Sequence, residues 1–143
     1  MRMRMNFSPD MRCGPTPEQI AKPGTEAAHQ TALFAWAALH VFQWPELAWM
    51  FAVPNGGTRD KIEAGFLKAQ GVRSGVPDIF LPVARRGMHG LFIEMKAKKG
   101  IVSPEQKIFG ENMKKQGYVC EICYGWEEAR DLILKYLKEG DLV

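Results

Sequence analysis

The sequence is poor in cysteine, which argues against a disulfide framework. It contains three cysteines, Cys13, Cys120 and Cys123, and an odd number of them does not indicate paired disulfides. Cys120 and Cys123 have the C-x-x-C spacing, but a structural zinc site needs a second pair of ligands. If both lie in a strand, residues three apart point to opposite faces. We therefore interpret them as reduced cysteines in or near the core of a cytoplasmic protein.

A long hydrophobic run is also lacking. A membrane-spanning helix needs about 20 consecutive apolar residues, and the longest candidate, Leu33 to Phe42, is short and interrupted by His40. The basic stretch from Met1 to Arg12 has no apolar segment behind it, so it does not resemble a secretory signal. We expect no association with membranes.

Strong charge of one sign is absent as well. The net charge is +3 and the isoelectric point is near 8.8, which suits a polyanionic partner and also many ordinary proteins. The length of 143 residues fits one domain. Residues 1–24 contain four of the nine prolines, so we predict an N-terminal arm without regular structure, followed by a folded domain over residues 25–143.

Hydrophobic periodicity, capping residues and turn residues predict an α/β domain around a small mixed sheet. The expected order is helix 25–42, strand 47–53, helix 60–70, strands 78–83 and 91–96, helix 103–117, strand 118–123 and helix 126–138. Strands 78–83 and 91–96 are joined by a short connection, most simply as a hairpin.

The predicted hairpin brings three polar residues together. Every odd position of both strands is apolar, whereas Asp78, Glu94 and Lys96 occupy even positions. If both strands present their apolar side chains to one core, Asp78 pairs with Glu94 and the turn centres on Arg86. A register shifted by one residue would separate the apolar faces, so we reject it.

Two adjacent carboxylates repel each other unless a cation or a shared proton lies between them. Mg²⁺ takes oxygen ligands, usually one or two carboxylates with water and substrate phosphate, so Asp78 and Glu94 suit Mg²⁺ or Mn²⁺. Such an ion acidifies bound water, and Lys96 can stabilise charge that develops on a phosphate. Taken singly, Pro77-Asp78 is typical of a turn and Glu94-x-Lys96 of a solvated strand; their matched spacing favours a catalytic site.

Glu26 and Gln106 are open to two interpretations. Glu26 follows Thr25 at a helix start, where acids are favoured by the helix dipole, but it also leans toward the inward side of that helix. Gln106 forms a capping-box pattern with Ser103. Loop residues suited to DNA contact are Arg73, Ser74, Arg85, Arg86, Lys98 and Lys99, with Asn55 and Gly56 allowing close backbone approach.

Read together, these segments resemble the VRR-NUC (virus-type replication-repair nuclease) family of the PD-(D/E)XK superfamily. The matching pieces are Thr25 to Gln30, Pro54 to Gly57, Gly71 to Asp78, Phe92 to Lys96 and Ser103 to Gln106. The resemblance extends over about residues 25–137. It implies a restriction-endonuclease-like core and metal-dependent hydrolysis of DNA.

The resemblance also implies roles for individual residues. Glu26, Asp78, Glu94 and the backbone carbonyl of Met95 would bind the metal ion. Lys96 would be the catalytic lysine, and Gln106 an active-site residue on the following helix. Relatives of this size look like phage or prophage proteins, which act in the host cytoplasm and cut branched DNA, including four-way (Holliday) junctions, as homodimers.

Two nuclease functions and one binding function remain open. Resolution of a four-way junction needs two related cuts, which a two-fold dimer supplies; the alternatives are a monomeric flap or nicking nuclease and a catalytically inert DNA-binding module. We expect no nucleotide cofactor. The three histidines lack the paired spacing of an HNH-type metal site. The four tryptophans belong either to the core or to a dimer interface, and they are Trp36, Trp44, Trp49 and Trp126.

Overall fold

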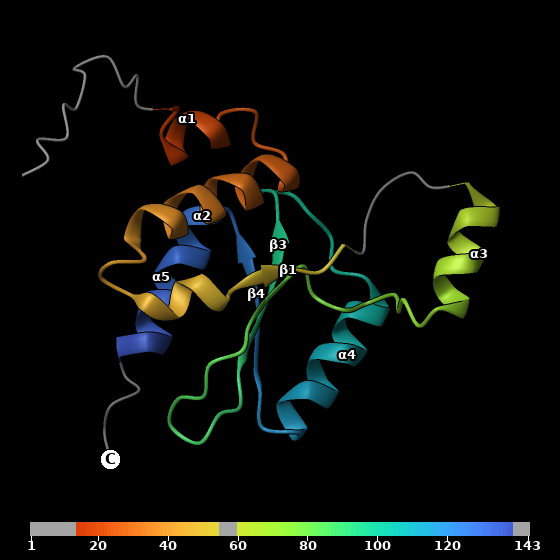
Figure 1. Cartoon of the computed structure of the whole chain (residues 1–143). Coiled ribbons are helices and arrows are strands. Elements are labelled where there is room, and N and C mark those ends of the chain that lie inside the picture. The colour runs from red at the N-terminus through yellow and green to blue at the C-terminus, as the bar shows by residue number, and fades with distance from the viewer. Residues whose placement is uncertain (1–13, 55–59, 139–143) are drawn as a thin grey trace, which may run out of the picture.

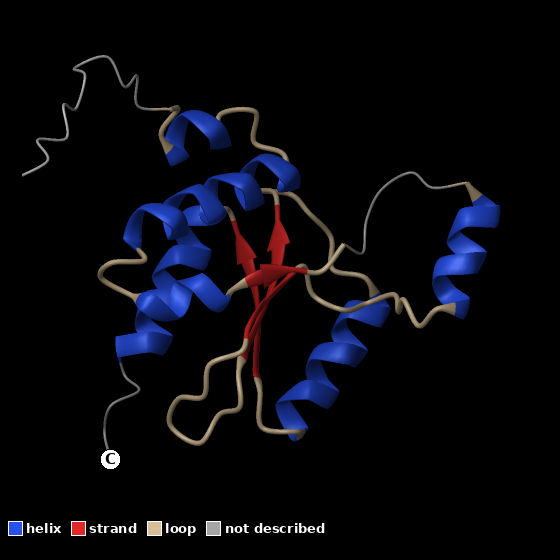
Figure 2. Cartoon of the chain, viewed as in Figure 1, coloured by secondary structure: helices blue, strands red, loops and turns tan. Residues whose placement is uncertain are grey.

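A four-stranded mixed sheet forms the centre of the protein. The computed structural model describes residues 14–54 and 60–138. The strands occur in the order β1 (Phe51–Ala52), β2 (Ile79–Leu81), β3 (Leu91–Lys96) and β4 (Val119–Tyr124). Strand β2 pairs antiparallel with both β1 and β3, while β4 runs parallel to β3 at one edge (Figure 2). This arrangement confirms the predicted α/β domain with a small mixed sheet.

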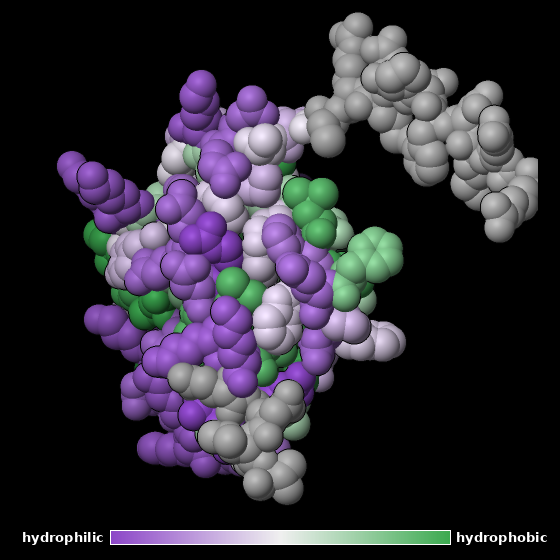
Figure 3. Space-filling model, turned by 90° about the vertical axis from the view of Figure 1, so that its left-hand side faces the viewer, coloured by the Kyte–Doolittle hydropathy of each residue, from purple (hydrophilic) through white to green (hydrophobic). Residues whose placement is uncertain are grey.

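Helices cover both faces of this sheet. They are α1 (Pro17–Ala21), α2 (Glu26–His40), the 3-10 helix η1 (Pro45–Trp49), α3 (Lys61–Ala69), α4 (Pro104–Lys115) and α5 (Trp126–Lys138). Helices α2 and α5 pack on one face and α4 on the other, whereas α3 projects from the body (Figure 1). The side formed largely by α2 and α5 presents mainly hydrophilic residues to solvent, with scattered hydrophobic ones (Figure 3).

The core lies between the sheet and the helices α2 and α5. The odd-numbered residues of β2 and β3 are fully buried there, and they are Ile79, Leu81, Leu91, Ile93 and Met95. The amphipathic helix α5 contributes Ala129, Ile133 and Leu137 to the same core. The opposite face of the sheet carries a smaller aromatic cluster, in which Phe92 stacks on Phe80 and meets Phe109 of α4 edge to face.

The hairpin register agrees with the one predicted from residue parity. Ile79 lies opposite Ile93 and Leu81 opposite Leu91, so continuing the ladder by one residue places Asp78 opposite Glu94. The turn reverses around Arg86, which adopts a positive φ of 46°, a conformation used in tight hairpin turns. The turn therefore lies at the far end of both strands from Asp78 and Glu94.

The strand expected over residues 47–53 is wrong in its first part. Residues 45–49 form the 3-10 helix η1, which begins at Pro45, and only Phe51 and Ala52 form a strand. In a 3-10 helix residues three apart face the same way, and accordingly Leu47 and Met50 are both buried while Trp49 is exposed. A continuous apolar run fits this geometry as well as it fits a buried strand.

The N-terminal arm was also predicted incorrectly where it can be observed. Residues 17–21 form α1, because Thr16 and Gln19 make a reciprocal capping box and Pro17 occupies the first helical turn. This helix packs against α2. Residues 1–13, including Cys13, lie outside the described residues.

Most of the cysteine and tryptophan side chains that the structure describes are buried or partly buried. Cys120 and Cys123 are free thiols and both are buried, and burial raises the pKa of Cys120 to about 11 and that of Cys123 to about 12. Trp36 and Trp126 are buried and Trp44 packs partly against the core, so Trp49 is the exposed member of the four. No helix within residues 14–54 and 60–138 is long and apolar enough to cross a bilayer.

Candidate active site

The polar face of the hairpin is buried rather than solvated. Glu94 is 4% exposed and Lys96 is 6% exposed, and both belong to β3. Asp78 immediately precedes β2 and is half-buried. Charged side chains are seldom buried unless they are paired or bind a metal ion, so both side chains need partners here.

Direct contacts hold these side chains together. Asp78 Oδ2 accepts a hydrogen bond of 2.8 Å from the Met95 backbone N–H. Lys96 Nζ lies 3.1 Å from Glu94 Oε1 and 3.9 Å from Glu26 Oε1. The hairpin therefore places an acid, a second acid and a lysine in one connected group, as the even-numbered pattern predicted.

Gln106 joins this group from the start of α4. Its Nε2 donates a hydrogen bond of 2.6 Å to Glu94 Oε1, while its Oε1 accepts one of 2.9 Å from the Ser103 backbone N–H. The Ser103 hydroxyl in turn accepts from the Gln106 backbone N–H. The same side-chain amide therefore both caps the helix and contacts the acidic pair.

Burial and charge both favour a cation at this pair. Burial raises the pKa of Glu94 to about 7, and the neighbouring Asp78 charge adds to the rise. Burial also raises the pKa of Asp78, although the Met95 N–H opposes the change. Glu94 Oε2 is buried and has no hydrogen-bond partner among the described residues. A proton or a metal ion between the carboxylates would satisfy this oxygen and reduce their repulsion.

Glu26 does not reach the other two acids in this structure. Within residues 14–54 and 60–138, no three His, Cys, Asp or Glu side chains are close enough to hold one metal ion. The half-exposed Glu26 carboxylate instead faces the Lys96 ammonium. The fit for a divalent ion therefore rests on Asp78 and Glu94, and ligation by Glu26 or by the Met95 carbonyl stays a prediction.

The expected DNA contacts fall into two groups. Lys98 and Lys99 are exposed in the turn that directly follows β3, the strand of Glu94 and Lys96. Arg73 and Ser74 are exposed in the segment that leads to Asp78, and they line a surface pocket against α4. Contact of these four residues with DNA stays a prediction.

The remaining expected contacts lie elsewhere. Arg85 forms a 2.8 Å ion pair with Glu46, and Arg85 and Arg86 occupy the hairpin turn at the far end of the strands. Their placement near the active face is therefore wrong, because the strands between carry the turn away from Asp78. Asn55 and Gly56 lie outside the described residues.

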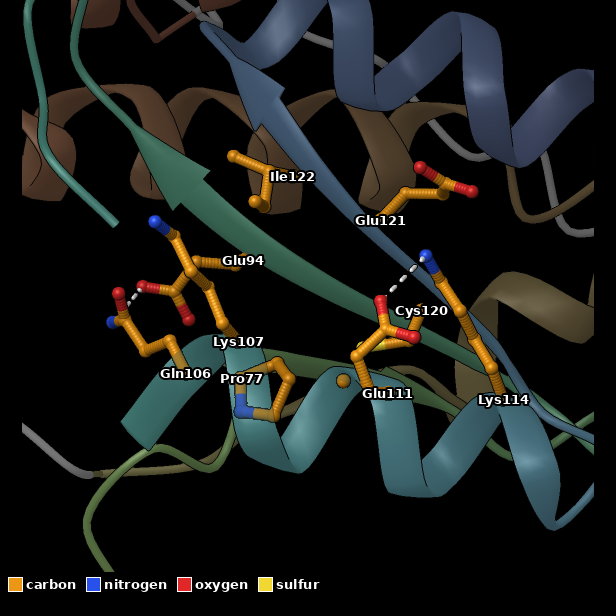
Figure 4. Close-up of a pocket in the computed structure, with 10 residues that line it drawn as sticks. Pro77, Glu94, Gln106, Lys107, Glu111, Lys114, Cys120, Glu121 and Ile122 are labelled. Carbon is orange, nitrogen blue, oxygen red and sulfur yellow. Dashed lines mark hydrogen bonds and ion pairs between the residues drawn. The ribbon is translucent and has the colours of Figure 1, made fainter. Parts of the chain in front are cut away.

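A cleft beside Glu94 contains residues that the sequence patterns did not single out. It lies between α4 and β4, with Glu94 and Gln106 at one end and Lys114 with Glu111 at the other (Figure 4). Lys107 and Ile122 also line it. Lys107 directly follows Gln106, but the position of Ile122 depends on the parallel pairing of β4 with β3, which no local pattern specifies.

Comparisons with known proteins identify the family and the fold. Residues 24–127 match the VRR-NUC domain. A solved structure described as a "VRR_NUC domain protein" superposes with a TM-score of 0.71 and 31% sequence identity, covering 82% of this chain and 91% of that one. The search of curated proteins found no match.

Proposed function

The chain belongs to the VRR-NUC domain family and is thus a nuclease, and from this premise we propose that it is a Mg²⁺- or Mn²⁺-dependent endonuclease that cuts branched DNA. The observation that carries the proposal is the buried Glu94 Oε2 next to Asp78 and Lys96, which has no hydrogen-bond partner in the part of the chain that the structure describes. A solvated surface pair would leave no such oxygen. The restriction-endonuclease-like arrangement of sheet and helices supports the same conclusion.

Asp78 and Glu94 would hold the divalent ion, with the Met95 carbonyl and a repositioned Glu26 as further oxygen donors. When bound, the ion would act as a Lewis acid toward the scissile phosphate and favour deprotonation of the attacking water. The Met95 N–H fixes one oxygen of Asp78. Gln106 and Lys96 both engage Oε1 of Glu94, which leaves Oε2 available for the ion.

Lys96 would stabilise the charge that builds up on the phosphate. Its ammonium is held by Glu94 at 3.1 Å and is shielded from solvent. A donor fixed in a site with little water is more effective than the same group in bulk solvent, because it needs no reorganisation during the reaction. The intact set of Asp78, Glu94 and Lys96 argues against an inert DNA-binding module.

The proposed substrate is a four-way junction and the proposed assembly is a homodimer. Two symmetric cuts need two sites, and two-fold association of one small domain supplies them. Helix α3 supports self-association, since its side chains Ile62 and Phe66 are exposed and lie one turn apart. A monomer acting on flaps or nicks is the second candidate function.

A cleavage panel tests this proposal. Duplex, flap, splayed-arm and four-way DNA of fixed sequence would be incubated with Mg²⁺, Mn²⁺ or EDTA, and the solution mass measured in parallel. We expect a dimer that makes paired, metal-dependent nicks in the four-way junction, and no cleavage by Asp78→Asn. A monomer that cuts only flaps would reject the junction and dimer assignments; wild-type protein that cuts none of these substrates would reject the proposed function itself.

A further inference from the structure

The strand next to the catalytic acids presents two exposed apolar side chains on the catalytic face. In the parallel pairing of β3 with β4, Ile122 lies beside Glu94 and Tyr124 beside Lys96. Because side chains alternate along a strand, Ile122 and Tyr124 point to the same side of the sheet as these two charged residues. Neighbouring strands are about 4.8 Å apart, so both side chains lie within the reach of one nucleotide.

Helix α4 covers only part of this face. Toward one end of the sheet it packs over Phe92 and Cys120, where a methyl group added at Gly110 would touch the Cys120 Sγ atom. Beyond that point Ile122 is 38% exposed and Tyr124 is 46% exposed. An open apolar surface therefore adjoins two of the most deeply buried charged residues of the protein.

A cation flanks the same surface. The cleft that ends at Glu94 is lined by Ile122 on β4 and by Lys107 on α4 (Figure 4). The described surface thus combines an apolar floor, a lysine at its rim and the catalytic carboxylates at its end. Protein–protein interfaces have few charges at their centre, whereas a nucleotide brings a flat apolar base together with an anionic phosphate.

We propose that Ile122 and Tyr124 form a platform on which one unstacked base of the cleaved strand packs, next to the scissile phosphate, with Lys107 near the adjoining phosphate. This inference rests on the proposed DNA nuclease activity and specifies how that site selects its substrate. Bases inside a duplex are covered by their neighbours, so a base must leave the stack before it can lie on a protein surface. A branch point supplies such a base at low cost, and the platform therefore favours cutting at branches over cutting in continuous duplex.

Stacking on an aromatic ring is tolerant of sequence, because every base presents a flat face. The platform thus selects a DNA shape and not a base sequence. Alanine replacement of an aromatic platform typically weakens binding by about 5- to 150-fold. For a ring that is half-exposed we expect a value of about ten-fold.

The test compares Tyr124→Ala, Tyr124→Phe and Phe42→Ala. Phe42 is the matched control, since it is a fully exposed aromatic residue (101% exposed) near the other end of α2 from Glu26. Each variant would be assayed on a branched DNA and on the same DNA with an abasic site beside the cut. Metal-free binding would be followed by the fluorescence of 2-aminopurine at that position.

We expect Tyr124→Ala to raise KM for the normal branched DNA by about ten-fold with kcat within two-fold, and to lose the distinction between normal and abasic DNA. Tyr124→Phe should retain the wild-type preference and the 2-aminopurine signal, and Phe42→Ala should behave as wild type. If Tyr124→Ala cleaves normal and abasic DNA as the wild type does, the proposed platform is wrong and the nuclease assignment still stands. A Tyr124→Ala protein that dissociates into monomers would also overturn it, because the surface would then be a subunit interface. Wild-type protein that cuts no DNA would remove the proposed function and this inference together.

Discussion

Gln106 both caps helix α4 and contacts Glu94, and different replacements of this residue can separate helix capping from catalysis. Its Oε1 accepts from the Ser103 N–H at 2.9 Å and its Nε2 donates to Glu94 at 2.6 Å. Gln106→Ala removes both contacts. A lost cap costs about 0.5–2 kcal/mol, and a lost hydrogen bond to a charged group about 1.5–3 kcal/mol. We expect a combined loss of about 2–5 kcal/mol, which lowers Tm by roughly 6–20 °C.

Gln106→Ala should also lower the cleavage rate by about 10- to 100-fold, the usual cost of removing a residue that orients a metal ligand. Gln106→Glu retains the oxygen that caps α4 but replaces the donor by a carboxylate next to Glu94. Like charges repel there, so this variant should lose at least about 100-fold in rate even though the oxygen that caps α4 is retained. Ser103→Ala should lose about 1 kcal/mol of stability and cut at nearly the wild-type rate.

The assays are thermal unfolding and single-turnover cleavage of the branched DNA. If Gln106→Glu cuts as fast as wild type, donation from Gln106 to Glu94 has no part in catalysis. If Ser103→Ala loses as much activity as Gln106→Ala, the effect arises from the helix start and not from the contact of Gln106 with Glu94.

Three further predictions follow from charges at the site. Lys96→Ala should bind DNA as wild type does while its cleavage rate falls by about 10²–10³-fold, and near-normal turnover would show that the lysine is a bystander. The pKa of Glu94 in the folded protein is raised from 4.5 to about 7, so between these pH values the metal-free folded protein binds more protons than the unfolded chain. Its free energy of unfolding should therefore fall by on the order of 3 kcal/mol between pH 4.5 and 7, and Mn²⁺ should restore much of this loss at pH 7.5. Denaturant titrations in which the free energy of unfolding does not fall over this pH range would contradict the burial of the acidic pair. Combined replacement of Lys98 and Lys99 by Ala should reduce the slope of log affinity against log salt by about 1.8, measured by fluorescence anisotropy with Lys135→Ala on α5 as control, and an unchanged slope would place the DNA elsewhere.

The hairpin and its acidic pair could be predicted because residue parity is a strong constraint. A shift of one residue would have moved Ile79 and Ile93 out of the core, so few registers were compatible with the pattern. The capping residues Thr25 and Ser103 fixed two helix starts for similar local reasons. The buried faces of α2 and α5 could be predicted from the helical periodicity of their apolar residues.

Features that depend on distant parts of the chain could not be predicted in this way. The apolar run at Leu47 fits both a strand and a 3-10 helix, and Pro45 favoured the latter. Arg85 is drawn to Glu46, which is 39 residues away in the chain. The positions of Ile122 and Tyr124 beside the acids follow from a parallel strand pairing that only the complete fold specifies.

In a crystal structure of the protein with Mn²⁺, the anomalous signal would locate the ion independently of activity and show directly whether Asp78 and Glu94 bind it. We predict a peak bound by oxygens of both Asp78 and Glu94, at distances of about 2.1–2.2 Å, and its loss in Asp78→Asn. Mn²⁺ bound elsewhere would show that Asp78 and Glu94 do not form the metal site. Carboxylates more than about 8 Å apart would show the same, since one ion with ligands at about 2.1–2.2 Å cannot join them.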